Sequence, residues 1–285
     1  MNENSQRSQL NYKTWLQGAT QQLQQIGISS SRLDSEIILA HTIGKPRTFV
    51  HAHLDDILTD RQHEIADARV DLRITRVPLA YIIGHKDFYG RQFKVTTATL
   101  VPRPESEIMI ELLKEVIGSN ISLIPEKPKR LIDVGTGSGI LGITAKLEYP
   151  ELIVDLLDVS AHALRIAEQN AEILHAEVRA TKSDLLQNYP FKADYILANL
   201  PYVDPEWERS PETNHEPEQA LFADDEGLAL IYKLIRQTPD SLQNGGYLFL
   251  EADPVQHAAI VKFAKEYNLT LHEKRDYQVV LRRES

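Results

Sequence analysis

The sequence predicts an α/β fold, in which a mostly parallel sheet carries helices on both faces and a smaller helical module precedes it. Three observations lead to this prediction. Strand-like and helix-like segments alternate from about residue 130 onward, which is typical of a parallel sheet covered by helices. The residues before 77 instead repeat apolar side chains at helical spacing. Polar side chains follow four of the predicted strands, where ligands bind in sheets of this class.

The N-terminal module is expected to span residues 1–76 and to be helical. Trp15, Leu16 and Leu23 lie at the spacing of one helix face. Thr59 and Gln62 have the form of a capping box that opens a helix over about residues 60–75. Its sequence offers no catalytic constellation. A small helical module without chemistry usually binds a partner or packs on its neighbour.

Residues 77–101 change in composition and are expected to form a linker built on a β-hairpin. The segments 79–84 and 88–95 are rich in residues that favour strands, and polar residues join them. The third part, residues 102–285, begins with a helix, since Pro104 suits a first helical turn.

From about residue 130 short apolar runs alternate with amphipathic stretches. The predicted strands are residues 131–134, 152–157, 178–181, 193–198, 247–250, 269–271 and 278–281. The predicted helices end near residues 149 and 175, and two more cover about 228–243 and 254–267. Because parallel strands end at one edge of a sheet, the polar residues that follow them are expected to lie close together.

A glycine-rich loop follows the first of these strands. Its sequence is Gly135-Thr136-Gly137-Ser138-Gly139. Glycines in this place let the backbone approach a ligand closely and adopt positive φ angles. Asp158 ends the second strand, 19 residues after Gly139, where an acid typically hydrogen-bonds the ribose of an adenosine ligand. These residues allow either a dinucleotide or S-adenosylmethionine.

Two further features favour S-adenosylmethionine. Asp184 ends the third strand region, where a carboxylate can accept a hydrogen bond from an adenine amino group. The fourth strand is followed by Asn199-Leu200-Pro201-Tyr202, where a methyl acceptor would be presented. A hydride-transfer enzyme has no use for such a tetrapeptide.

The tetrapeptide is the candidate catalytic motif. The Asn199 side chain can hold a flat NH2 group, and the Tyr202 ring can pack on a planar one. Pro201 restrains Leu200 to an extended conformation. We expect Asn199 Oδ1 and the Leu200 carbonyl to accept the two N–H bonds of the substrate nitrogen, a task in which any side chain at position 200 would serve. On these residues alone, adenine and a glutamine amide both fit, and the transfer needs no metal.

The composition narrows the function classes. A net charge of -10 makes the chain a poor polyanion binder. Residues 204–226 hold nine acids and one base, which would form a solvated loop or an acidic lip beside the site. The chain has no cysteine, which excludes a thiolate metal site. Residues 1–6 are polar and no apolar run reaches the roughly 20 residues of a membrane span, so we expect a cytoplasmic protein.

Taken together, the motifs resemble those of the release-factor glutamine methyltransferases, the HemK/PrmC family. The resemblance covers nearly the whole chain and rests on residues 79–95, 101–107, 133–139 and 216–228. It implies an N-terminal helical domain that docks the release factor and a seven-stranded class I S-adenosylmethionine-dependent methyltransferase domain. It also implies methyl transfer to the side-chain amide nitrogen of the Gln in the release factor's Gly-Gly-Gln motif.

The resemblance assigns cofactor binding to the loop 135–139 and to Asp158. Asn199 is expected to contact both the cofactor and the substrate. Leu185, next to Asp184, lies where the family often has a larger aromatic residue against the adenine. The family usually has Asn-Pro-Pro-Tyr, and this chain has Leu200 in place of the first proline.

Asn-Leu-Pro-Tyr is also familiar from ribosomal RNA adenine dimethyltransferases. One alternative is therefore an N6-adenine methyltransferase acting on RNA, and another is a catalytically silent scaffold that binds cofactor and release factor. The hairpin, the segment 101–107 and the acidic charge favour the release factor. We expect a monomer that binds a release factor and neither nucleic acid nor a membrane.

Overall fold

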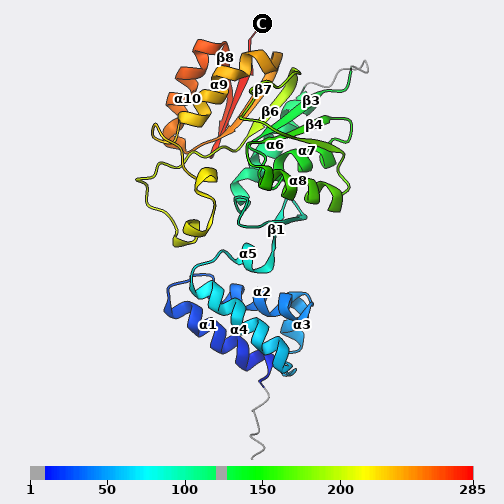
Figure 1. Ribbon diagram of the computed structural model, residues 1–285, viewed down its shortest axis with the longest axis vertical. Helices are drawn as coiled ribbons and strands as arrows, with labels where there is room; N and C mark the ends of the chain where they lie inside the picture. Colours follow the sequence, from blue (N-terminus) through cyan, green and yellow to red (C-terminus); the bar gives the residue numbers. More distant parts are fainter. Residues whose placement is uncertain (1–9, 120–126, 285) are drawn as a thin grey trace, which may run out of the picture. The chain divides into compact units, whose positions relative to one another are not determined.

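The computed structural model describes residues 10–119 and 127–284 and shows two compact units (Figure 1). The helical unit comprises the described residues up to Gly84 together with the short segment Pro211–His215. The α/β unit comprises His85–Ser210 and the residues from Glu216 onward. The polar residues 1–6 lie outside the described part. Within that part, no helix is long and apolar enough to cross a bilayer.

The helical unit packs its helices around an apolar core of its own. Its elements are α1 (Tyr12–Gln25), α2 (Ser31–Ile43), α3 (Arg47–Ala52), α4 (Asp60–Ile74), α5 (Leu79–Ile83) and the 3-10 turn η2 (Pro211–His215). Trp15, Leu16, Ile38 and Val70 are buried together in this core. The helical character predicted for the N-terminal part is thus confirmed.

The predicted capping box at the start of α4 is confirmed. Thr59 Oγ1 accepts a hydrogen bond from the Gln62 backbone N–H at 3.2 Å, and Gln62 Oε1 accepts one from the Thr59 N–H at 3.0 Å. Two backbone donors that the helix itself cannot satisfy are therefore paired. At the C-terminal end of α2, Gly44 adopts φ 63°, the left-handed conformation that glycine tolerates, and ends the helix.

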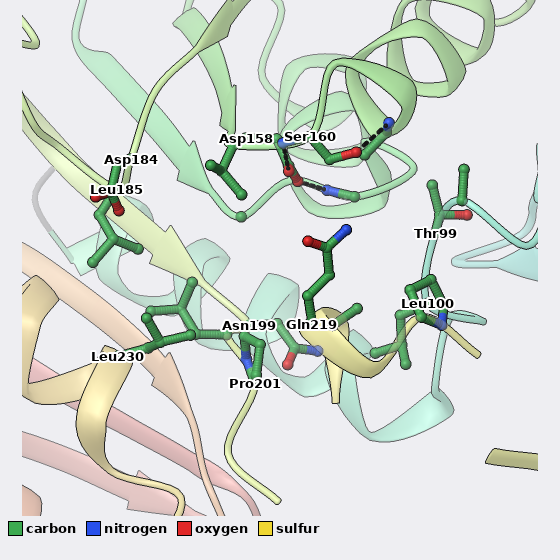
Figure 2. A pocket seen from close by; sticks show the side chains of 18 of the residues that line it. Thr99, Leu100, Asp158, Ser160, Asp184, Leu185, Asn199, Pro201, Gln219 and Leu230 are labelled. Carbon is green, nitrogen blue, oxygen red and sulfur yellow. Dashed lines mark hydrogen bonds between the residues drawn. The ribbon is translucent and has the colours of Figure 1, made fainter. Parts of the chain in front are cut away.

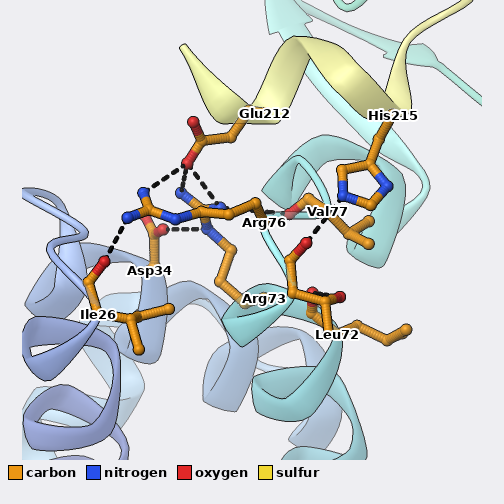
Figure 3. A network of polar contacts seen from close by, with 9 residues as sticks. Ile26, Asp34, Leu72, Arg73, Arg76, Val77, Glu212 and His215 are labelled. Atoms are coloured by element: carbon orange, nitrogen blue, oxygen red, sulfur yellow. Dashed lines mark hydrogen bonds and ion pairs between the residues drawn. The ribbon is translucent and has the colours of Figure 1, made fainter.

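The turn η2 is tied into the helical unit by a buried arginine (Figure 3). The Arg73 guanidinium donates to Asp34 Oδ2 at 2.7 Å and to Glu212 Oε1 at 3.0 Å, and Arg76 also donates to Glu212 Oε1, at 3.2 Å. His215 Nε2 lies 2.8 Å from the Thr75 carbonyl oxygen. The acidic stretch 204–226 therefore does not run freely through solvent, because part of it is an ion-paired element of the helical unit.

The prediction of strand structure over residues 79–84 is wrong. Leu79–Ile83 forms the single-turn helix α5, with Pro78 before it and Gly84 after it at φ 79°. The N–H groups of Tyr81 and Ile82 both donate to the Pro78 carbonyl. Pro78 presets the first turn, and Gly84 supplies the left-handed residue that ends it.

The predicted hairpin is confirmed over a shorter range. It joins β1 (His85–Phe88) to β2 (Arg91–Lys94) in antiparallel register. Phe88 and Phe93 are buried and meet edge to face, with ring centroids 6.2 Å apart. The division of the chain after residues 76 and 101 stays a prediction.

The α/β unit is built on a seven-stranded sheet. Its strands are β3 (Arg130–Val134), β4 (Ile153–Asp158), β5 (Val178–Lys182), β6 (Ala193–Ala198), β7 (Leu242–Glu251), β8 (Leu269–Arg275) and β9 (Gln278–Arg283). They lie in the order β5-β4-β3-β6-β7-β9-β8. The five from β5 to β7 are parallel, and β9 runs antiparallel to both neighbours. The chain order reverses between β3 and β6, and ligands bind at such a switch point.

Helices cover both faces of this sheet (Figure 1). The α/β unit contains α6 (Glu107–Ser119), α7 (Ile140–Glu148), α8 (Ala161–Ile173), α9 (Ala229–Ser241), α10 (His257–Ala264) and the 3-10 turns η1 (Pro104–Ser106), η3 (Glu218–Ala220), η4 (Pro254–Gln256) and η5 (Lys265–Tyr267). Residues of α6, α7 and α8 pack with the hairpin phenylalanines on one face. Residues of α9 and α10 pack on the other. The predicted α/β class is confirmed.

One strand is longer than predicted. β7 begins at Leu242, directly after α9, and runs through Gly245 and Gly246, which the sequence pattern placed in a break before residue 247. A Cβ on Gly246 would lie 2.9 Å from the Asp194 carbonyl oxygen. This glycine therefore permits a close approach of two strands, a known role of glycine inside a strand.

Candidate active site

The polar strand ends surround one pocket at the switch point (Figure 2). Of the predicted site residues, those that line it are Gly135, Gly137, Asp158, Asp184, Leu185, Asn199, Leu200 and Pro201. Within the described part of the chain, Thr136, Ser138, Gly139 and Tyr202 are not among the lining residues. The convergence expected from the strand ends is thus present, and the four other residues lie outside the pocket lining.

The glycine loop is bound to the end of β4 by its backbone. The N–H groups of Gly135 and Thr136 both donate to the Leu157 carbonyl, at 2.8 and 2.9 Å. Gly135 adopts φ 70°, and a Cβ there would lie 2.8 Å from Leu200 Cδ2. Glycine at position 135 therefore does two things, since it permits the left-handed backbone and leaves room for the Leu200 side chain.

Asp133, at the end of β3, fixes the loop from below. Its Oδ2 accepts from the Thr136 hydroxyl at 2.6 Å and from the Gly142 N–H at 2.9 Å. The carboxylate is 1% exposed. Burial raises the pKa of Asp133 to about 6, and the nearby Asp158 adds to the rise. Thr136 is thereby turned toward the protein interior.

Asp158 is held by two backbone amides at the entrance to α8. Its Oδ2 accepts from the Gly137 N–H at 2.9 Å, and its Oδ1 accepts from the Ser160 N–H at 2.8 Å. Burial raises the pKa of this carboxyl. Each carboxylate oxygen has two acceptor positions, so both can accept a further bond from a ligand hydroxyl in the pocket.

Asp184 and Leu185 border the far end of the pocket. Asp184 Oδ2 forms an ion pair with Lys233 Nζ of α9 at 2.5 Å. Leu185 is buried and adopts φ 54°, and the next residue's N–H donates to Gln237 Oε1 at 2.8 Å. No sequence pattern indicates the Lys233 contact, because α9 follows some fifty residues later in the chain.

The tetrapeptide begins immediately after β6 and divides into two parts. Asn199, Leu200 and Pro201 line the pocket. Tyr202 points its hydroxyl to Glu251 Oε1 at 3.3 Å, and burial beside this carboxylate raises the pKa of the phenol. The Leu200 side chain is 4% exposed and belongs to the core on the α9 side of the sheet. The Leu200 side chain thus fills the core, and the role predicted for its carbonyl stays a prediction.

Behind Asn199 lies a buried polar cluster that sequence reasoning missed. Asn199 Nδ2 donates to Ser106 Oγ at 3.0 Å, and the Ser106 hydroxyl donates to Glu251 Oε2 at 2.7 Å. Gln278 Nε2 donates to the same carboxylate oxygen at 3.1 Å. Ser106, Glu251 and Gln278 are each at most 1% exposed. Burial raises the pKa of Glu251, against the effect of its hydrogen-bond donors.

Part of the acidic stretch forms the opposite wall. Pro217, Gln219 and Ala220 line the pocket, and Figure 2 shows the Gln219 side chain reaching toward its middle. Glu216, which is buried, accepts from Arg103 at 2.5 Å and from the Val101 N–H at 3.1 Å. Three residues of the stretch thus border the site, while none of its acidic residues, all of which the structure describes, is among the lining residues, and the acidic lip stays a prediction.

The end of this stretch is locked to the tetrapeptide. Gln256 Nε2 donates to the carbonyl oxygens of Tyr202 and Glu226, at 2.9 and 2.8 Å. Gly227 adopts φ 82°, and a Cβ there would lie 2.1 Å from the Tyr202 carbonyl oxygen. Only glycine permits this approach.

Comparison with known proteins agrees with this architecture. Residues 14–84 match the PrmC N-terminal domain, and residues 110–216 match the methyltransferase small domain. A methyltransferase from Pyrococcus furiosus superposes with a TM-score of 0.52 at 16% identity, covering 77% of this chain and 98% of that one. A T. thermophilus 16S rRNA N2 G1207 methyltransferase in complex with AdoMet and guanosine gives a TM-score of 0.51 at 16% identity, covering 70% and 50%.

The sheet order and the pocket at its switch point define a class I methyltransferase. The release factor glutamine methyltransferase of Escherichia coli (strain K12) is 33% identical over 253 residues, covering 85% of this chain and 86% of that protein. The chain therefore belongs to the release factor glutamine methyltransferase family.

Proposed function

We propose that this enzyme transfers the methyl group of S-adenosylmethionine to the side-chain amide nitrogen of the Gln in the Gly-Gly-Gln motif of a peptide chain release factor. One observation carries the proposal beyond family membership. In the part of the chain that the structure describes, no donor hydrogen-bonds to Asn199 Oδ1 or to the Leu200 carbonyl oxygen. Two acceptors at the pocket wall are therefore available for the two N–H groups of a primary amide.

The residues of the pocket fit S-adenosylmethionine. A Cβ at Gly135 would meet the Leu200 side chain, and the positive φ angles of Gly135 and Gly137 bring bare backbone to the pocket. Asp158 would hold the ribose hydroxyls, and Asp184 and Leu185 would hold the adenine. When bound, the cofactor supplies a methyl group on a positively charged sulfur. Thr136, Ser138 and Gly139 would act by keeping the loop in shape.

Positioning is the main contribution that the protein makes to the transfer. A carboxamide nitrogen is a weak nucleophile because its lone pair is delocalised. Asn199 Oδ1 and the Leu200 carbonyl would orient this nitrogen and stabilise the positive charge that develops on it. Holding the reacting atoms in line at about 3 Å lowers the barrier further. Tyr202, which does not line the pocket, would support the tetrapeptide through its hydrogen bond to Glu251, and the proton would leave to water after the transfer.

A protein substrate fits the charge better than RNA does. Residues 204–226 contribute nine acids and one base, and three of them, Pro217, Gln219 and Ala220, line the pocket. An excess of negative charge in a segment next to the site disfavours a phosphate backbone. We further propose that the helical domain docks the release factor, that the enzyme acts as a monomer in the cytoplasm, and that domain boundaries lie near residues 76 and 101.

The test uses labelled S-adenosylmethionine with a release factor and with ribosomal RNA in separate reactions. Label on a single Gln of the release factor is expected. Label on RNA adenines would instead support an adenine methyltransferase, and no label in either reaction would support a silent scaffold. The variant Asn199→Ala should lower turnover roughly 10²- to 10³-fold with cofactor binding intact. Near-normal turnover of that variant would refute the role given to Asn199.

A further inference from the structure

We propose that Ser106 and Glu251 are positioning residues that fix which way the Asn199 carboxamide faces. The inference rests on the proposed function, because it concerns how Asn199 presents Oδ1 to the substrate amide. A carboxamide has one acceptor end and one donor end. Rotated by half a turn, Asn199 would offer an NH2 group to a substrate NH2 group, and the two donors could not bond.

The hydrogen-bond inventory allows a single orientation. Ionised Glu251 can only accept hydrogen bonds, so the one hydroxyl proton of Ser106 is directed to it, at 2.7 Å. Ser106 Oγ then has only acceptor capacity left for Asn199. The end of Asn199 that faces Ser106, at 3.0 Å, must therefore be Nδ2. Oδ1 is left on the other side, where the residue lines the pocket.

Hydrogen-bond donors on both carboxylate oxygens favour the ionised form of Glu251, against the burial that raises its pKa. Its Oε2 accepts from Ser106 and Gln278, its Oε1 accepts from Tyr202 at 3.3 Å, and the Asn199 amide also lowers its pKa. Gln278 faces Glu251 directly across the β7–β9 ladder. Gln278 Oε1 is buried without a hydrogen-bond partner in the described part of the chain, so the polar network is satisfied at the Glu251 carboxylate rather than throughout. Glu251 thus connects the antiparallel strand β9 to the tetrapeptide.

The same carboxylate links the two polar residues of the tetrapeptide. Asn199 reaches it through Ser106, and Tyr202 donates to it directly. A loss of the negative charge would let the Ser106 hydroxyl donate to Asn199 instead, and the carboxamide could then reverse so that Oδ1 accepts this bond. A reversed Asn199 would no longer hold the substrate nitrogen in place, and misplacement of reacting groups lowers rates strongly.

The experiment measures kcat and KM for Ser106→Ala, Glu251→Gln and Ser106→Thr. We expect the first two to lower kcat roughly 10- to 100-fold, with KM for S-adenosylmethionine and for the release factor within about twofold of the wild type. Ser106→Thr keeps the hydroxyl, so its kcat should be much closer to the wild-type value than that of Ser106→Ala. The matched control is Asp155→Asn on β4, which removes an equally buried carboxylate that accepts from Arg130, Arg179 and Tyr189. Its kcat should stay near the wild-type value.

A second readout does not depend on turnover. The side-chain 15N–1H signals of Asn199, identified by their absence in Asn199→Ala, should shift in Ser106→Ala and Glu251→Gln and stay in place in Asp155→Asn. Unchanged kcat in Ser106→Ala and Glu251→Gln, or unchanged Asn199 signals, would overturn the positioning role. If Asn199→Ala is inactive while those two variants are normal, only this inference fails. If Asn199→Ala is active, the proposed role of the tetrapeptide fails first.

Discussion

The buried carboxylate of Asp133 should make the stability of this protein depend on pH in a way that one substitution removes. In the folded chain burial raises its pKa from 3.8 to about 6. The folded state therefore holds this proton more tightly than the unfolded state does. Between pH 3.8 and about 6 the contribution to the free energy of unfolding falls as pH rises, and above this window the loss is complete.

The magnitude follows from the pKa difference of about two units. At about 1.4 kcal/mol per unit, the ionised Asp133 destabilises the fold by about 3 kcal/mol at neutral pH relative to strongly acid solution. Asp133→Asn removes this dependence. Its carbonyl oxygen can take the place of Oδ2, which accepts from both Thr136 and Gly142. The new NH2 group lacks a partner there, which costs about 1–3 kcal/mol at every pH.

The assay is urea unfolding of wild type and Asp133→Asn without cofactor. The difference in unfolding free energy between wild type and Asp133→Asn should change by about 1.4 kcal/mol between about pH 7.5 and about pH 5. As pH falls, the wild type should become more stable relative to the variant. Effects of pH shared by both proteins cancel in this difference. Asp240→Asn, at an exposed position on α9, controls for the change in net charge. A difference that stays constant with pH for Asp133→Asn would refute the reasoning.

Two further predictions concern the close contacts around the tetrapeptide. Leu200→Ala should lower the free energy of unfolding by about 2–5 kcal/mol, as expected for a buried leucine. At temperatures well below the melting temperature, its kcat should stay within a few-fold of the wild-type value, because the backbone carbonyl is kept. A large loss of kcat in the folded variant would contradict this prediction. Gly227→Ala should lower both the melting temperature and kcat, since its Cβ would meet the Tyr202 carbonyl at 2.1 Å. Gly118→Ala in α6, which has open space, should instead stabilise the protein by about 0.5–1 kcal/mol, and equal melting temperatures for the two alanine variants would count against the contact.

The features that the sequence predicted correctly are local. The capping box at Thr59 and the glycine loop at 135–139 need only residues a few positions apart. The strand ends could be placed together because parallel strands finish at one edge, a rule that needs no knowledge of contacts. This was sufficient for the fold class and for most of the pocket lining.

The errors arose where a short apolar run was ambiguous. Residues 79–83 have a composition that favours strands, and periodicity cannot distinguish a strand from a helical turn over five residues. Pro78 and Gly84 are the start and stop signals of a helical turn, and the hydrogen bonds from the Tyr81 and Ile82 N–H groups to the Pro78 carbonyl show that this turn forms. The local stop signals carried more information here than the side chains between them.

The buried cluster behind Asn199 had no local signal at all. Ser106 and Asn199 are 93 residues apart in the chain, and Ser106 and Glu251 are 145 apart. Each is an ordinary polar residue in its own segment. Their meeting depends on η1 being packed against the end of β7, which is a tertiary contact that no pattern within one segment encodes.

Residue 200 shows how two motifs that read as separate depend on one another. The glycine loop was interpreted as a cofactor cradle and the tetrapeptide as a substrate clamp. Yet a Cβ at Gly135 would strike the Leu200 side chain, which is itself buried in the core. The departure from the family's usual proline therefore leaves the carbonyl available but makes the side chain part of the loop's support. A change at either position should be felt at the other, so that the combined effect of Gly135→Ala and Leu200→Ala on stability should be smaller than the sum of the two single effects.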